Sequence, residues 1–104
     1  MDFSYLTAIS DGDQDFIDEF ISTFERNAGN IIADIKAARA KNDLDIQKKL
    51  AHQLKPSLEM LGLSSLQIAL NIQNDPTSVN DADVDEMESE CTKAVEALKQ
   101  EFNQ

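Results

Sequence analysis

With 104 residues, the chain has room for a single domain with one core, which we expect to cover residues 1–104. Its formal net charge of −11 argues against nucleic acid and anionic lipid as partners. The sequence contains no apolar run of about 18 residues and no basic stretch before an apolar N-terminal one, so we predict neither a membrane-spanning helix nor a secretory signal. Its one cysteine, Cys91, cannot form an internal disulfide, which favours a reducing compartment and a cytoplasmic protein.

The first part of the chain predicts a short helical segment and then one long helix. Residues 3–9 are apolar enough for one or two helical turns, which the following S-D-G-D sequence should end. Apolar side chains then recur at helical spacing as far as about Lys41, with Asp11 or Asp13 as the N-cap. A glycine–asparagine pair at 29–30 interrupts the pattern, and we favour one helix over two in line. The spacing places three aromatic side chains in the core: Phe16, Phe20 and Phe24.

The next predicted helix contains the only histidine, with Asn42 or Asp43 as its N-cap and Gly62 as its end. At about 100° per residue, several side chains fall within about 60° of His52: Asp45, Lys48, Lys55, Pro56 and Glu59. An apolar arc lies on the opposite side of the helix: Ile46, Leu50, Ala51, Leu54, Leu58 and Leu61. The pattern therefore predicts an imidazole that points into solvent, with an ammonium group one turn away on either side.

Two further helices complete the predicted all-α fold. Ser64 and Gln67 are spaced as a capping box for the first, which should stop before an N-D-P sequence at 74–76. The last helix should begin between Asp81 and Asp85 and bury seven side chains: Val84, Met87, Cys91, Ala94, Val95, Leu98 and Phe102. Four main amphipathic helices with short links predict an antiparallel, up-and-down four-helix bundle with the short N-terminal helical turn at one end. Because each helix can bury its apolar face within the chain, we expect a monomer.

The charges are unevenly distributed along the sequence. Seven of the nine Lys and Arg residues lie in the basic segment from Arg26 to Lys55, where three Asp residues oppose them. This segment has a net charge of +4, and the rest of the chain, with two basic and 17 acidic residues, has one of −15. A basic surface around His52 would suit a small anion or an acidic cleft on another protein. Charge alone favours the simpler interpretation, in which these residues form a solvated helix face.

The histidine lies within a recognisable motif. The H-x-L-K-(small)-S-x(4)-G signature of histidine-containing phosphotransfer (HPt) domains is matched at His52, Leu54, Lys55, Ser57 and Gly62. Over most of its length the chain resembles this family of phosphorelay modules from two-component signalling. The resemblance implies reversible exchange of a phosphoryl group with aspartyl phosphate on the receiver domains of a hybrid histidine kinase and a response regulator. It also implies that Mg²⁺ is held by the receiver, and that this chain needs no cofactor of its own.

The resemblance assigns His52 as the phosphoryl acceptor and Lys55 as the residue that stabilises the phosphoryl group. A neutral imidazole is a suitable nucleophile near pH 7, and an attached phosphoryl group adds about two negative charges that a nearby ammonium group stabilises. Lys48, one turn before the histidine, and Gln53, beside it, are candidate supporting residues.

Two positions depart from the family pattern. Pro56 stands where glycine is usual, and it should bend or loosen the helix because it has no N–H to donate to the carbonyl of His52. This change could open access to His52, or it could be a tolerated kink. Glu59 stands where a small residue is usual. Its carboxylate could orient the imidazole or repel an incoming phosphoryl group. We favour orientation, which predicts slower phosphorylation of His52 in Glu59→Ala.

Several functions are disfavoured by what the sequence lacks. It has no G-x-x-x-x-G-K-(S/T) or other glycine-rich phosphate loop, so we expect no autonomous ATP-dependent kinase activity. The D-A-D-V-D sequence at 81–85 resembles the start of a calcium loop, but Glu86 and Thr92 occupy its glycine and final acidic positions, so we predict no metal site. Two alternatives to a phosphoryl carrier remain. One is a helical adaptor that binds receiver domains without transfer, and the other is a structural protein in which the histidine is incidental.

Overall fold

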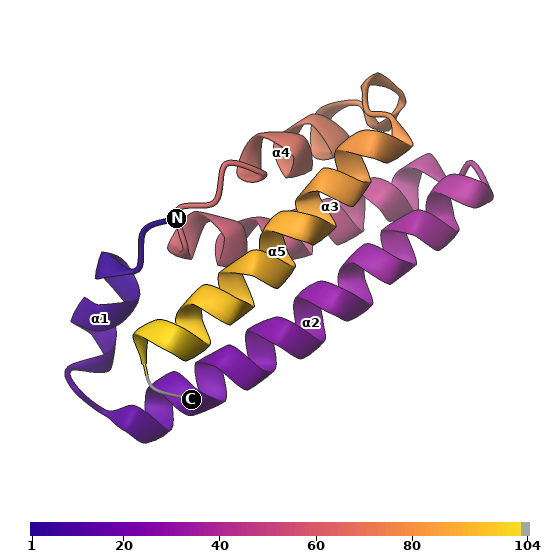
Figure 1. Cartoon of the computed structure of the whole chain (residues 1–104). Helices are drawn as coiled ribbons and strands as arrows, with labels where there is room; N and C mark the ends of the chain where they lie inside the picture. The colour runs from indigo at the N-terminus through magenta and orange to yellow at the C-terminus, as the bar shows by residue number, and fades with distance from the viewer. Residues whose placement is uncertain (103–104) are drawn as a thin grey trace.

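The computed structural model describes residues 1–102, and over this range the chain is helical throughout, with short connections (Figure 1). Its elements are α1 (Ser4–Ser10), α2 (Gln14–Ala40), α3 (Leu44–Met60), α4 (Leu66–Asn74), the 3-10 turn η1 (Pro76–Ser78) and α5 (Asp81–Glu101). The predicted all-α class is confirmed. None of these helices combines the length and apolar composition needed to cross a bilayer.

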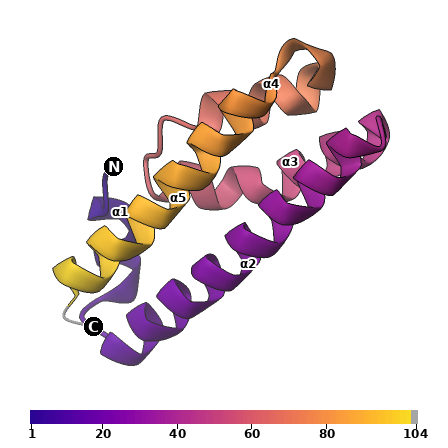
Figure 2. The same cartoon turned by 45° about the vertical axis from the view of Figure 1, so that its right-hand side comes forward.

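One core joins the helices. Helix α2 packs against both α3 and α5, and α4 contacts both α3 and α5 (Figures 1 and 2). Helices α2 and α5 run side by side in opposite directions, and α1 lies against α2. Every helix contributes fully buried side chains, among them Leu6, Ile32, Leu58, Ile72 and Met87. The N–H of Asp2 donates to the carbonyl of Leu61 at 2.9 Å, and this hydrogen bond ties the N-terminus to the end of α3.

Helix α2 is continuous, as the sequence predicts. Asp13 is its N-cap and accepts hydrogen bonds from the N–H groups of Asp15 and Phe16. The buried stripe runs at helical spacing: Ile17, Ile21, Phe24, Ala28, Ile32, Ile35 and Ala38. Of the three phenylalanines predicted to be in the core, only Phe24 is buried. Phe20 is half-buried and stacks on Phe24, whereas Phe16 is 42% exposed because it lies about 100° away from Ile17, where the stripe starts.

Alanine substitutions at two glycines are expected to change the free energy of unfolding in opposite directions. Gly29→Ala is expected to raise the free energy of unfolding by about 1 kcal/mol, because interior glycine weakens a helix; an added Cβ would meet nothing within 4 Å there.

Gly62→Ala is the contrasting variant. Gly62 has a φ of +61°, and its Cβ would lie 3.0 Å from the Cβ of Asp2, so a loss of about 1–2 kcal/mol is expected. Urea unfolding measures both changes, and destabilisation by Gly29→Ala would contradict the first.

Helix α3 begins and ends where the sequence predicts. The Asp43 side chain caps it by accepting from the N–H of Ile46, and the left-handed Gly62 follows its last turn. The helix continues through Pro56 to Met60.

The predicted capping box at the start of α4 is wrong. Ser65 is the N-cap and its side chain makes no capping hydrogen bond. Instead, Glu90 of α5 accepts from the Ser64 hydroxyl and from the Ser65 N–H, both at 2.7 Å. Partial burial alone would raise the pKa of Glu90, but the hydrogen bonds from Ser65 and Ser64 outweigh it and hold this pKa below its usual range. A carboxylate 25 residues away thus replaces the local partner.

Helix α5 starts within the predicted range. Asn80 accepts from the N–H of Asp83, and the Asp83 carboxylate accepts from the N–H of Asn80, which completes a capping box. The predicted apolar stripe is confirmed for six side chains: Val84, Met87, Cys91, Ala94, Val95 and Leu98. The seventh, Phe102, is half-buried against the core.

Candidate functional site

His52 lies in the middle of α3 on its exposed face. The opposite face of the helix enters the core through Gln47, Ala51, Leu54 and Leu58, with Leu61 just beyond the last turn. The exposed position of His52 is the one that the helical spacing predicts. One residue of the predicted apolar arc differs: Ile46 is 41% exposed, because it lies at the edge of the arc in the first turn.

The imidazole of His52 makes no hydrogen bond or ion pair with any side chain in residues 1–102. The exposed ring is therefore available to another molecule. A neutral imidazole has one nitrogen with a free electron pair, which can attack an electrophile, and one that carries the proton. An exposed ring of this kind can act as a nucleophile on a group that a second macromolecule presents.

Three lysines surround the ring along α3. Lys48 and Lys49 are exposed and precede His52 by about one turn, whereas Lys55 is half-buried and follows it by about one turn. At about 100° per residue, Lys49 and Lys55 project about 60° to opposite sides of His52. These ammonium groups can stabilise negative charge that arrives at the imidazole.

Lys48 also faces the turn that follows α4. Hydrogen bonds from Thr77 hold the pKa of Asp75 below its usual range, and the nearby Lys48 ammonium adds to this effect. The charge of Lys48 therefore acts on Asp75 as well as on the surface near His52.

The basic segment 26–55 does not present all its charges around the histidine. Lys36 of α2 pairs with Asp85 at 3.3 Å and with Glu88 at 2.8 Å, both on α5. Arg39 pairs with Asp81 at 2.9 Å. These two cations are paired with carboxylates of α5, so the predicted basic surface is smaller than the sequence count suggests.

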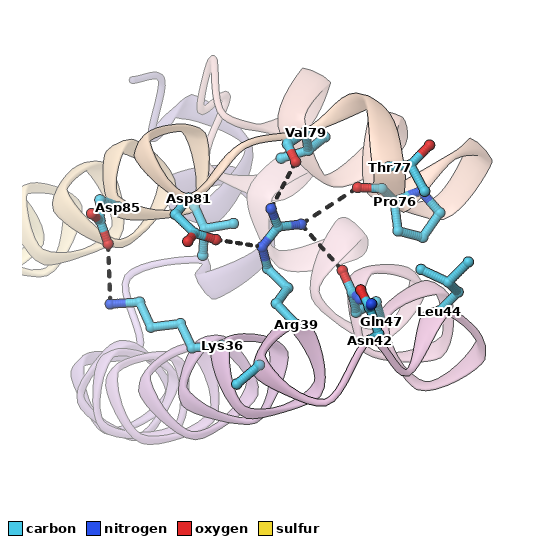
Figure 3. Close-up of a pocket in the computed structure, with 12 residues that line it drawn as sticks. Lys36, Arg39, Asn42, Leu44, Gln47, Pro76, Thr77, Val79, Asp81 and Asp85 are labelled. Atoms are coloured by element: carbon cyan, nitrogen blue, oxygen red, sulfur yellow. Dashed lines mark hydrogen bonds and ion pairs between the residues drawn. The ribbon is translucent and has the colours of Figure 1, made fainter.

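Arg39 is the centre of a polar junction that the sequence pattern does not predict (Figure 3). Besides Asp81, its guanidinium donates to the side-chain oxygen of Gln47 at 3.2 Å and to the carbonyls of Pro76 and Val79 at 3.4 and 2.7 Å. A cleft of about 650 Å³ surrounds this junction. Because Arg39 already has four acceptors, the cleft is a joint between helices and not a site for an added anion. The one sequence signal was Gln47, a polar residue in register with Ala51 and Leu54.

The other candidate residues are placed as follows. Gln53, Pro56 and Glu59 are exposed on the same side of α3 as His52. Helix α3 is not interrupted at Pro56, but the proline leaves the His52 carbonyl without the donor that position 56 would otherwise supply. The Glu59 carboxylate makes no hydrogen bond to the imidazole. The orienting role predicted for Glu59 therefore has no contact to support it.

Cys91 is a buried free thiol, and burial raises its pKa to about 12. Such a thiol is a packing residue and not a nucleophile. In the described part of the chain, no three His, Cys, Asp or Glu side chains gather closely enough to hold a metal ion.

Comparison with protein-family models, with curated proteins and with solved structures finds no match to this chain. The resemblance to HPt domains therefore stays a prediction from the motif at 52–62.

Proposed function

We propose that this protein is a phosphorelay carrier. It would accept a phosphoryl group on His52 from the aspartate of one receiver domain and pass it to the aspartate of another. The observation that carries the proposal is the single imidazole exposed in mid-helix, within the HPt-like motif and with Lys48 and Lys55 nearby.

The transfer step needs little from the chain itself. A nitrogen electron pair of neutral His52 attacks the phosphorus of the aspartyl phosphate, so that a P–N bond forms as the P–O bond breaks. The carboxylate leaves with the electron pair, and the imidazole keeps its proton on the other nitrogen until solvent removes it. Transfer to the second receiver is the reverse reaction with a different carboxylate. Mg²⁺ on the receiver would stabilise the charge during both steps, as the resemblance implies.

The fold suits this role. We infer that α2 to α5 form the antiparallel, up-and-down four-helix bundle of a monomeric HPt domain in the cytoplasm. The exposed face of α3 and the adjoining part of α2 would be the docking surface. The encounter should be weak, because a carrier must release one receiver before it meets the next.

The proposal is tested by mixing the protein with receiver domains labelled with ³²P on aspartate. A carrier acquires label that is lost in acid and retained in base, as expected for phosphohistidine. A chain that takes up no label from any receiver is not a carrier.

A second candidate function is a helical adaptor that binds receivers without transfer. The exposed carboxylate of Glu59, two turns from His52 on the same face, favours this alternative because it would repel an incoming phosphoryl group. Receiver binding without label would support the adaptor. A chain that shows neither binding nor label would be a structural protein with an incidental histidine.

Lys55→Ala is expected to slow phosphoryl transfer to His52 about tenfold, or about 1.4 kcal/mol. Lys55 is half-buried, so its ammonium group is more restricted than that of a fully exposed lysine. Lys49→Ala is the matched control, since Lys49 is the same distance from His52 in sequence but exposed, and its effect should stay below about twofold. Initial rates of label transfer measure both variants. Equal effects would mean that only net charge matters.

A further inference from the structure

A groove of about 350 Å³ lies between α2 and α5, and we call it the α2–α5 groove. Gly29, which is exposed, forms part of its α2 wall. The buried residues that line it are all apolar: Ala28, Ile32, Cys91 and Val95. No residue of α3 lines the groove, so it is separate from the exposed face that carries His52.

Gly29 has no role that the folded chain itself explains. It lies inside α2, where glycine weakens a helix relative to alanine. It is not among the glycines with a positive φ, and a Cβ added to it would meet nothing within 4 Å. Neither the backbone conformation nor the packing of residues 1–102 therefore requires glycine at this position. Because a position without a Cβ lets another backbone approach closely, Gly29 points to a contact with a second molecule.

The exposed side of α2 beside Gly29 carries small side chains. Ala33 and Ala37 follow it by about one and two turns, and both are exposed. At about 100° per residue, they lie about 40° and 80° from Gly29 around the helix. Two helices approach most closely where the side chains between them are smallest. A second helix can therefore lie along this side of α2 and cover the apolar lining of the groove.

Charged residues alternate in sign at the two ends of the groove. At one end, Glu25 of α2 pairs with Lys99 of α5 at 3.0 Å. Near the other end, Lys36 of α2 pairs with Glu88 of α5 at 2.8 Å. A second copy turned end for end would set its Lys36 opposite Glu25. The same rotation would set its Glu88 opposite Lys99, so that opposite charges meet at both ends.

We infer that the α2–α5 groove is a self-association site, at which a second copy of this chain docks with its α2 antiparallel to the first and crossing it near Gly29. The contact has two-fold symmetry, so each copy covers the groove of the other. A parallel arrangement is disfavoured, because it would set Glu25 beside the second copy's Glu25 and Lys36 beside its Lys36. Each chain already buries its own apolar stripes, so folded monomers pair reversibly, with a Kd on the order of 10⁻⁴ M.

The charge pattern identifies a second copy as the occupant. A uniformly basic helix of another protein would meet Lys36 or Lys99, and it would be repelled there. A uniformly acidic helix would meet Glu25 or Glu88. The remaining acid of the lining, Glu96, would lie about 7.5 Å along the helix axis from the second copy's Glu96. Exposed ion pairs contribute little energy, so the charges set the direction of pairing, and the close approach at Gly29 sets its strength.

The test is sedimentation equilibrium of the full chain from about 10 µM to about 1 mM. At about 0.15 M salt, a Debye length of about 8 Å screens the net charge of −11 on each copy. The wild-type chain should pass from monomer to dimer over this range. Gly29→Ala should raise the dissociation constant about tenfold, and Gly29→Gln should form no dimer, because each added side chain separates the two backbones.

Both variants should also unfold at a higher urea concentration than the wild type, because alanine and glutamine are better helix formers than glycine. A loss of dimer together with a gain in stability cannot result from a loss of fold. Asn27→Ala is the matched control, since Asn27 is exposed on α2 about 160° from Gly29 around the helix. It should raise stability too, and leave pairing unchanged. His52→Gln should pair like the wild type, because α3 does not line the groove.

A wild-type chain that stays monomeric at about 1 mM overturns the inference. So does a dimer that persists in Gly29→Gln, or one that Asn27→Ala weakens as much as Gly29→Ala does, since either result places the contact elsewhere. No receiver domain enters these measurements, so the carrier proposal and the self-association site succeed or fail separately.

Discussion

The His52→Gln variant is expected to lose phosphoryl transfer by at least about 10³-fold and to keep its fold. Glutamine has no nitrogen electron pair that can form a phosphoryl bond, so the reaction loses its nucleophile. The side chain of His52 is exposed and makes no hydrogen bond or ion pair within residues 1–102. Its replacement should therefore change the free energy of unfolding by no more than about 0.5 kcal/mol. Transfer of ³²P from a labelled receiver and urea unfolding measure the two effects.

The exposed Gln53→Ala variant is the control for this experiment, because it changes the neighbouring residue without removing a nucleophile. It should keep most of the transfer activity. Label that persists in His52→Gln would place the acceptor elsewhere in the chain and reject the carrier proposal. A large loss of stability in His52→Gln would mean that the imidazole has a structural role that its exposure does not suggest.

Arg39→Ala is expected to lower the free energy of unfolding by about 3 kcal/mol. The Arg39 side chain is only 16% exposed. Its guanidinium connects α2 to α3 through Gln47, to η1 through the carbonyl of Pro76, and to the start of α5. Without it, the buried side-chain oxygen of Gln47 loses its hydrogen-bond donor, and a buried acceptor without a partner costs about 1–3 kcal/mol. The exposed pair with Asp81 should add little.

Lys36→Ala is the matched control for Arg39→Ala, since Lys36 also lies in α2 and pairs with carboxylates of α5. Both of its ion pairs are exposed to solvent, so its loss of stability should be much smaller. Urea unfolding at one pH compares the two variants. Folded Arg39→Ala protein should still accept a phosphoryl group on His52, because the junction around Arg39 does not include the exposed face of α3. Equal destabilisation by the two variants would show that the acceptors of Arg39 are satisfied by water.

Much of the helical structure follows from local sequence. Asp13 and Asp43 are recognisable as N-caps because a cap bonds to N–H groups two or three residues away. The continuity of α2 across Gly29 and the exposed position of His52 follow from apolar spacing alone. These features depend on residues within one or two turns of each other, which a sequence displays directly.

Other features depend on how the helices pack. The sequence does not show that Glu90 supplies the partner for Ser64 and Ser65, or that Arg39 bonds to a carboxylate 42 residues away. Nor does it show that Tyr5 of α1 and Glu59 of α3 line the same surface hollow. Apolar spacing also overestimates the core at Phe16 and Ile46, because both lie at the edge of their apolar stripes, where spacing alone does not tell whether a side chain is covered.

The amino-acid sequence by itself determined that the chain is helical, where α2, α3 and α5 begin, and that the histidine faces outward. The reason is that helix formation and capping are decided by residues about three or four positions apart. The tertiary structure alone decided which cations are used between helices and which remain near His52. Those outcomes depend on distances between helices that are remote in sequence.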